Sequence, residues 1–176
     1  MKMLQRLTFV LGGASSGKSV YAEGLAVGTG LPRTYIATAQ AFDAEMRAKI
    51  DLHRTQRGPD WTTVEAPYDL APALKAVPAG QVVLLDCVTL WLSNLLLREE
   101  PTPDDDIAKV LAALERMEGP VIVVSNEVGQ GIVPENRLAR RFRALQGALN
   151  RDIAARADTV VAVMAGLPLA LKGPLP

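Results

Sequence analysis

The feature that most constrains this chain is the segment Gly12 to Ser19, which satisfies the pattern G-x-x-x-x-G-K-[ST]. It lies between an apolar run, Leu7 to Leu11, and a helix-like segment, the context that a phosphate-binding loop requires. Such a loop directs backbone N–H groups at a phosphate, and the helix amino end adds partial positive charge. Lys18 can then reach the β and γ phosphates of a nucleotide. The alternative is a Gly/Ser-rich turn with an exposed lysine, and the flanking pattern favours the phosphate loop.

Short apolar runs recur along the chain and alternate with helix-like segments. Rich in Val, Ile and Leu without polar alternation, these runs are typical of strands that helices cover on both faces. The predicted strands are Leu7–Leu11, Thr34–Ala37, Val82–Leu85, Val121–Val124 and Thr159–Met164, with Thr62–Glu65 as a further short candidate. The predicted helices are Ser19–Ala26, Ala41–Arg54, Asp104–Met117 and Pro134–Ala157, the last with Pro134 as its first residue. The pattern predicts an α/β, P-loop NTPase-like three-layer fold with a mainly parallel sheet.

Composition narrows the class of protein. The 176 residues predict one catalytic domain spanning 1–176, and 19 basic residues balance 19 acidic ones, so no net field favours nucleic acid or an anionic membrane. No window is apolar enough to predict a membrane span.

The single cysteine, Cys87, lies in an apolar run and is expected to be a buried thiol of a cytoplasmic protein. The tail from Leu167, with three prolines, is expected to be an irregular arm or an edge segment.

A Mg²⁺ ion on a phosphate loop is held by the loop hydroxyl, here Ser19, and usually by a carboxylate at the end of a neighbouring strand. Asp86 is the best candidate because it ends the run Val82–Leu85. The other interpretation of Asp86 is a strand-terminal residue that caps the next helix.

His53 is the only histidine, and it lies beside Lys49, Arg54 and Arg57. Such a histidine is usually structural, and the helix dipole favours one at a helix end. Basic surroundings also suit a polyphosphate, and an imidazole, with an ordinary pKa of about 6.5, is largely neutral and nucleophilic at pH 7. Trp61 is either a stacking platform for a ligand or a packing residue.

These segments together resemble a known family, the bifunctional adenosylcobinamide kinase and adenosylcobinamide-phosphate guanylyltransferase of cobalamin biosynthesis. The resemblance covers nearly the whole chain. It runs through GGASSGKS, YIATAQAFDAEMRAKIDLHR and WTTVE, and it is most distinctive in SNEVGQGIVPENRLARRFRALQGALNRDIAARAD. It implies phosphorylation of adenosylcobinamide by ATP or GTP, then transfer of GMP from GTP to give adenosyl-GDP-cobinamide and pyrophosphate.

The resemblance also implies roles for individual residues. His53, following Asp43, Glu45 and Met46, would be the guanylylated residue, and Lys18 would assist it. Glu65 can accept the paired N–H donors of guanine, which would explain a preference for GTP. The implied nucleotide contacts are Gly12, Gly13, Ala14, Ser15, Ser16, Gly17, Lys18, Ser19, Ala37, Thr38, Ala39, Arg54, Thr55, Gln56, Arg57, Glu65 and Asp86. The resemblance further suggests that the loop with Asn126 and Glu127 borders the active site.

The chain departs from the family pattern at three positions. Ser15 stands where the loop often has Arg, Gly58 where Pro often follows Arg57, and Asp86 where some members have Glu. None of these changes removes a reacting group. The loss of an arginine at position 15 removes a possible phosphate contact and puts nucleotide affinity, or the balance of the two activities, in question.

Two other functions compete with this one. A P-loop kinase for another small molecule would form no covalent nucleotide, and a nucleotide-dependent switch or assembly ATPase would need no corrinoid acceptor. Neither accounts for the His53 segment or the long helical segment. The resemblance suggests a homo-oligomer, a trimer with active sites at subunit boundaries, and no nucleic-acid partner or membrane insertion is expected.

Overall fold

The computed structural model describes residues 4–40, 60–99 and 102–176. Its core is a seven-stranded sheet in the order β3-β2-β4-β5-β1-β6-β7, with every pairing parallel except that of β6 with β7. The strands are β1 (Leu7–Gly12), β2 (Arg33–Ala37), β3 (Trp61–Glu65), β4 (Val82–Asp86), β5 (Val121–Asn126), β6 (Thr159–Met164) and β7 (Leu167–Lys172). The predicted α/β class with a mainly parallel sheet is confirmed.

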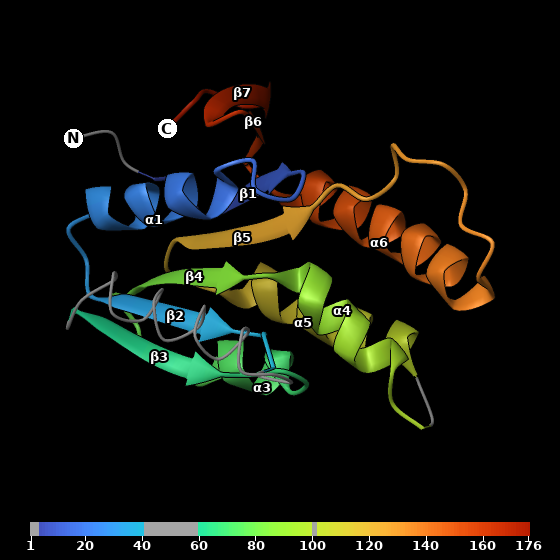
Figure 1. Cartoon of the computed structure of the whole chain (residues 1–176). Helices are drawn as coiled ribbons and strands as arrows, with labels where there is room; N and C mark the ends of the chain where they lie inside the picture. The colour runs from blue at the N-terminus through green and yellow to red at the C-terminus, as the bar shows by residue number, and fades with distance from the viewer. Residues whose placement is uncertain (1–3, 41–59, 100–101) are drawn as a thin grey trace.

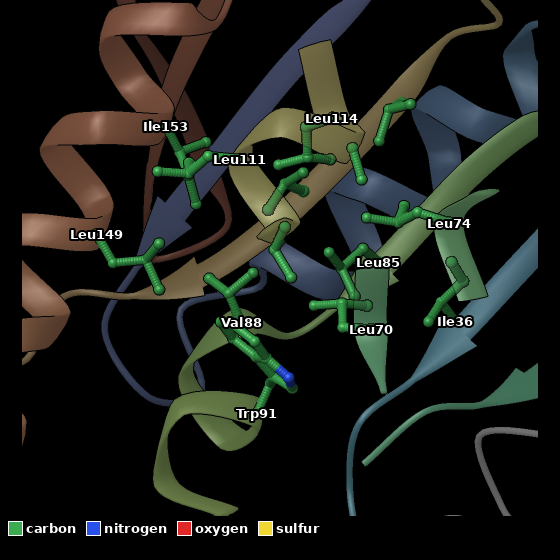
Figure 2. Close-up of a cluster of buried hydrophobic side chains, with 14 of the residues drawn as sticks. Ile36, Leu70, Leu74, Leu85, Val88, Trp91, Leu111, Leu114, Leu149 and Ile153 are labelled. Carbon is green, nitrogen blue, oxygen red and sulfur yellow. The ribbon is translucent and has the colours of Figure 1, made fainter. Parts of the chain in front are cut away.

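Helices cover both faces of the sheet, which gives three layers (Figure 1). On one face α1 (Lys18–Gly28) packs with Ala22 and Ala26 against alternate residues of β1, β4, β5 and β6. The other face is covered by α3 (Leu70–Lys75), α4 (Val88–Leu96), α5 (Pro103–Arg116) and α6 (Arg137–Arg156). Figure 2 shows the core on that second side, where Trp91 and Val88 of α4 meet leucines from several elements.

Strands β1, β4 and β5 are buried on both faces, because successive side chains point into the two helical layers in turn. This accounts for the unbroken runs of Val, Ile and Leu from which the strands were predicted. The carboxyl ends of β2, β3, β4 and β5 point to the same end of the molecule (Figure 1). Because β1 runs parallel to β5, the phosphate loop and the loop that follows β5 lie at that same end.

The structure corrects one predicted helix boundary, confirms the edge segment as the form of the tail, and adds two helices. The long helix begins at Arg137 rather than Pro134, because the Asn136 side chain caps it, accepting hydrogen bonds from the N–H groups of Leu138 at 2.8 Å and Ala139 at 3.2 Å. The tail from Leu167 forms β7, an antiparallel edge strand. Helices α3 and α4 were not predicted, and the predicted helix Ala41–Arg54 lies outside the described residues. Among the residues that the structure does describe, no helix is long and apolar enough to cross a membrane.

Candidate active site

The phosphate loop connects the end of β1, Gly12, to the first residue of α1, Lys18. Two of its residues have positive φ, Ser15 at 57° and Gly17 at 91°. Gly17 precedes α1 directly, so the loop turns sharply into the amino end of that helix. Lys18 is only 8% exposed, and its Nζ donates a hydrogen bond to the Gly13 carbonyl at 3.0 Å. The ammonium group is thus held over the loop, where it can meet a phosphate.

The loop is packed from behind by the turn between β6 and β7. The Gly166 N–H donates to the Ser16 carbonyl at 2.8 Å, and a Cβ added at Gly17 would lie 3.1 Å from the Gly166 Cα. A Cβ at Gly12 would lie 2.5 Å from both the Ser16 Oγ and the Val163 carbonyl oxygen. Gly12 is therefore required by close packing and Gly17 by both packing and backbone conformation. This contact between the hairpin and the phosphate loop was not predicted from the sequence.

Three of the predicted nucleotide contacts lie in one row across the carboxyl edge of the sheet. Ala37 of β2 is paired with Glu65 of β3 on one side and with Asp86 of β4 on the other. The residues two positions earlier in β2 and β4, Tyr35 and Leu84, belong to the core cluster that contains α1. Because side chains alternate along a strand, this row faces the same side of the sheet as α1 and Lys18.

Thr38 joins the ends of two of these strands. It is fully buried, and its Oγ1 donates to the Cys87 carbonyl at 2.7 Å and accepts from the Cys87 N–H at 2.9 Å. Its own carbonyl accepts a hydrogen bond from the Asn94 side chain at 2.9 Å. The Thr38 hydroxyl is committed to the protein, and any part that Thr38 plays in nucleotide binding must therefore come from the backbone it positions beside Ala39.

Cys87 behaves as a buried core residue. It is 6% exposed and caps the amino end of α4, where its Sγ accepts from the Leu90 N–H at 3.5 Å. Burial, and then the neighbouring Asp86 carboxylate, raise the pKa of the Cys87 thiol to about 11. The thiol is therefore protonated near pH 7 and is a poor nucleophile.

The aromatic residue at the start of β3 is occupied by its neighbours. The Trp61 ring makes an edge-on contact with Tyr35, with ring centroids 6.2 Å apart, and the Arg33 guanidinium lies 5.5 Å from the Trp61 ring centroid. These contacts favour packing over ligand stacking, the two roles that the sequence left open.

The loop that follows β5 lies directly beside the phosphate loop. The Glu127 N–H donates to the Gly12 carbonyl at 3.1 Å, and the Glu127 Oε1 accepts from the Gly129 N–H at 2.6 Å. From α6, Arg143 donates to the Gly129 carbonyl. Glu127, from the loop that follows β5, and Arg143, from α6, thereby order the segment beside the phosphate loop.

Ser19 and Asp86 are the residues that the sequence predicts to hold Mg²⁺. Within residues 4–40, 60–99 and 102–176, no group of three or more His, Cys, Asp and Glu side chains could hold a metal ion. Ser19 and Asp86 would supply one hydroxyl and one carboxylate, so phosphate oxygens and water must complete the coordination, as Mg²⁺ prefers. His53, Arg54, Thr55, Gln56 and Arg57 lie outside the described residues, and their roles stay predictions.

Comparison with solved structures supports the fold. The chain resembles the flagellar accessory protein FlaH of Methanocaldococcus jannaschii with a TM-score of 0.54 and 16% identity, covering 96% of this chain and 78% of that one. It also resembles the type III secretion ATPase EscN of enteropathogenic E. coli with a TM-score of 0.57 and 9% identity, covering 91% of this chain and 43% of that one. At such low identities these likenesses concern the fold alone.

Sequence relatives are much closer. The bifunctional adenosylcobalamin biosynthesis protein CobP of Pseudomonas aeruginosa is 47% identical over 166 residues, which cover 93% of this chain and 96% of the relative. The corresponding protein CobU of Escherichia coli K12 is 40% identical over 181 residues, covering 94% of this chain and 99% of the relative. The family model described as cobinamide kinase / cobinamide phosphate guanyltransferase matches residues 8–171. The chain therefore belongs to the cobinamide kinase / cobinamide phosphate guanyltransferase family.

Proposed function

We propose that this cobinamide kinase and cobinamide phosphate guanylyltransferase carries out both reactions at one phosphate loop. It phosphorylates adenosylcobinamide with ATP or GTP. It then transfers GMP from GTP to adenosylcobinamide phosphate, giving adenosyl-GDP-cobinamide and pyrophosphate. The observation that carries this proposal is the row Glu65–Ala37–Asp86, which faces the side of the sheet where Lys18 and α1 lie. Glu65 would then recognise the guanine, Asp86 would bind the metal ion and the phosphate loop would bind the phosphates of one nucleotide.

In the kinase reaction the cobinamide hydroxyl attacks the γ-phosphorus directly and a new P–O bond forms. The bond from the γ-phosphorus to the bridging oxygen breaks and releases ADP or GDP, and the hydroxyl proton passes to water. The loop N–H groups and Lys18 stabilise the charge on the transferred group. Ser19 and Asp86 would hold Mg²⁺, which supplies charge neutralisation at the phosphate oxygens when bound. Covalent participation of the protein is not needed in this step.

The guanylyl transfer proceeds through a covalent intermediate on His53. The neutral imidazole attacks the α-phosphorus of GTP, a P–N bond forms, and the bond to the bridging oxygen breaks to release pyrophosphate. A phosphate oxygen of adenosylcobinamide phosphate then attacks the same phosphorus, and the P–N bond breaks. Support for His53 comes from the sequence pattern alone. We assign the remaining predicted contacts, Ala37–Ala39 and Arg54–Arg57, to the nucleotide as well.

The decisive experiment is incubation with Mg²⁺ and GTP labelled at the α-phosphorus, followed by mass spectrometry. We expect an acid-labile, base-stable GMP adduct on His53, which disappears in His53→Ala and weakens below about pH 6, where the imidazole becomes protonated. The kinase activity of His53→Ala should survive, because direct transfer needs no histidine. A GMP adduct at another residue, or one that persists in His53→Ala, would overturn the mechanism. The absence of any adduct would favour a kinase alone or a nucleotide-dependent switch.

We also infer that the chain acts as a single catalytic domain and self-associates in the cytoplasm, as a trimer. Support for association comes from β7, the last strand of the sheet order, whose alternate residues Leu167, Leu169 and Leu171 are 72%, 58% and 57% exposed. Met164, paired with Leu167, is 70% exposed. An edge strand with a row of exposed leucines is an unfavourable surface for a monomer.

A further inference from the structure

A buried polar cluster joins β5 to α4 and α6 just behind the carboxyl edge of the sheet. It consists of Thr89, Ser125, Gln146 and Asn150, whose exposed fractions are 6%, 0%, 0% and 7%. The Ser125 Oγ lies 2.6 Å from the Asn150 Oδ1, 2.9 Å from the Gln146 Nε2 and 3.3 Å from the Thr89 Oγ1. The Gln146 Nε2 also donates to the Asn150 Oδ1 at 2.9 Å.

Which group donates in each hydrogen bond of this cluster follows from the Asn126 backbone groups to which the cluster is bonded. The Asn126 carbonyl can only accept, so the atom of Asn150 that lies 3.2 Å from it is the Nδ2, and the opposite atom is the acceptor Oδ1. Ser125 must then donate to Asn150, which leaves Thr89 as the donor to Ser125. The Thr89 oxygen is free to accept from the Asn126 N–H at 2.7 Å.

The cluster therefore makes hydrogen bonds to both the N–H and the carbonyl of Asn126. On this side of β5 the sheet no longer provides partners for these groups. Strand β4 ends at Asp86, which is paired with Val124, so residues 125 and 126 extend beyond it. Thr89, at the start of α4, and Asn150 of α6 take over the contacts that β4 would have made. On the other side Asn126 is paired with Gly12, the first residue of the phosphate loop.

The alternation of β5 gives the direction of the Asn126 side chain. Val121 and Val123 belong to the core cluster of α4 and α6, and Ser125 continues that face. Ile122 and Val124 belong to the cluster of α1, so Asn126 faces the side that carries Lys18.

We propose that Thr89 and Asn150 are positioning residues that clamp the backbone of Asn126, and that the Asn126 carboxamide contacts the γ-phosphoryl group in the kinase reaction. This inference rests on the proposed function, because it requires a nucleotide on the loop Gly12–Ser19. The side-chain N–H of an asparagine is a neutral hydrogen-bond donor. Because the backbone of Asn126 is held on both sides, this donor needs little reorganisation as charge develops on the transferred group.

The first test measures nucleotide binding and kinase turnover of Asn126→Ala with adenosylcobinamide as acceptor. We expect kcat to fall on the order of a hundredfold, as for the loss of one preorganised donor, while the Kd for GDP, which has no γ-phosphate, stays within about twofold. An unchanged kcat would overturn the assignment of Asn126. GTP binding by wild type that is absent, or that is retained fully in Lys18→Ala, would instead refute the proposed function.

The second test is Thr89→Val, which keeps the shape of the side chain and removes the hydroxyl. We expect kcat to fall about tenfold with little change in nucleotide KM, and Thr89→Ser, which restores the hydroxyl, to recover it. Thr8→Val is the matched control. Thr8 is also a buried threonine, in β1, and its Oγ1 has no partner, so its loss should leave kcat unchanged.

A double-mutant cycle separates positioning from general destabilisation. If Thr89 acts through Asn126, Thr89→Val should lower kcat in wild type but have little further effect in Asn126→Ala. An equal loss in both backgrounds would overturn the clamp. Asn150→Asp offers the same cycle should Thr89→Val fail to fold, because it keeps the acceptor for Ser125 and Gln146 and removes the donor to the Asn126 carbonyl.

Discussion

At the scale of single residues, the choice of guanine over adenine depends in our proposal on Glu65, an exposed carboxylate at the end of β3. A carboxylate can accept from both N–H donors of guanine, whereas an amide oxygen and an amide N–H cannot both do so. Glu65→Gln should therefore lower the ratio of GTP to ATP affinity by about tenfold, as measured by competition binding. Glu118 precedes the first residue of β5, whereas Glu65 is the last residue of β3, so the two lie at opposite edges of the parallel sheet. Glu118→Gln should therefore leave the ratio unchanged. An unchanged ratio in Glu65→Gln would show that another residue reads the base.

Cys87 allows a prediction about pH. Since burial and Asp86 raise the pKa of this thiol to about 11 from the ordinary 9.0, ionisation is harder in the folded protein than in the unfolded chain. The contribution of the neutral Cys87 thiol to the free energy of unfolding is complete below about pH 9 and is lost as the pH rises toward 11. At pH 9 iodoacetamide should alkylate the native protein far more slowly than the urea-unfolded protein. Equal rates would show that the thiol is accessible and ionised in the native state.

At the scale of elements, the β6–β7 hairpin is a structural part of the phosphate site. Gly166→Ala places a side chain at a φ of 77°, where an L residue costs about 1 kcal/mol, with no atom within 4 Å of the new Cβ. The turn should shift and release the Ser16 carbonyl, so nucleotide affinity should fall several-fold in isothermal titration. Gly80→Ala is the matched control, since Gly80 has a φ of 79°, equally open surroundings and a position before β4, away from the loop. Equal nucleotide affinities for the two variants would exclude a role for the hairpin in binding.

The elements also show where local sequence is informative. Buried parallel strands must be apolar along their whole length, so β4, β5 and β6 were recognisable from their runs of Val, Ile and Leu. Helix α4 was missed for the same reason, because seven of its nine residues are buried and no polar face marks its period. The start of α6 was misplaced because Pro134 is a good first residue, yet Asn136, which offers a capping oxygen, stands two residues later.

At the scale of the whole molecule, the site depends on register, which no local pattern contains. The phosphate loop was predictable because all the residues of the loop that contact phosphate lie in one short segment with a fixed conformation. The alignment of Glu65, Ala37 and Asp86 arises from pairings between strands distant in sequence. Asp86 was predicted from its place at the end of a strand, whereas Glu65 and Ala37 were placed at the site by the family resemblance alone. The contact of Gly166 with Ser16 joins residues 16 and 166, and nothing in either segment alone indicates it.

Self-association is the property of the whole molecule that the exposed face of β7 makes testable. Leu169 lies at the centre of that face, 58% exposed between Leu167 and Leu171. A lysine there would place a charge in the apolar contact that we propose between subunits, where it would have no partner. We expect sedimentation velocity to give the mass of three chains for wild type and of one chain for Leu169→Lys at the same concentration.

Val27→Lys, which changes a residue of α1 that is 52% exposed on a different surface, should keep the wild-type mass. Both variants should melt within a few degrees of each other as isolated chains, because neither side chain is part of the core. A wild-type protein that sediments as one chain, or a Leu169→Lys variant that keeps the mass of three, would show that this leucine face is not where the subunits meet.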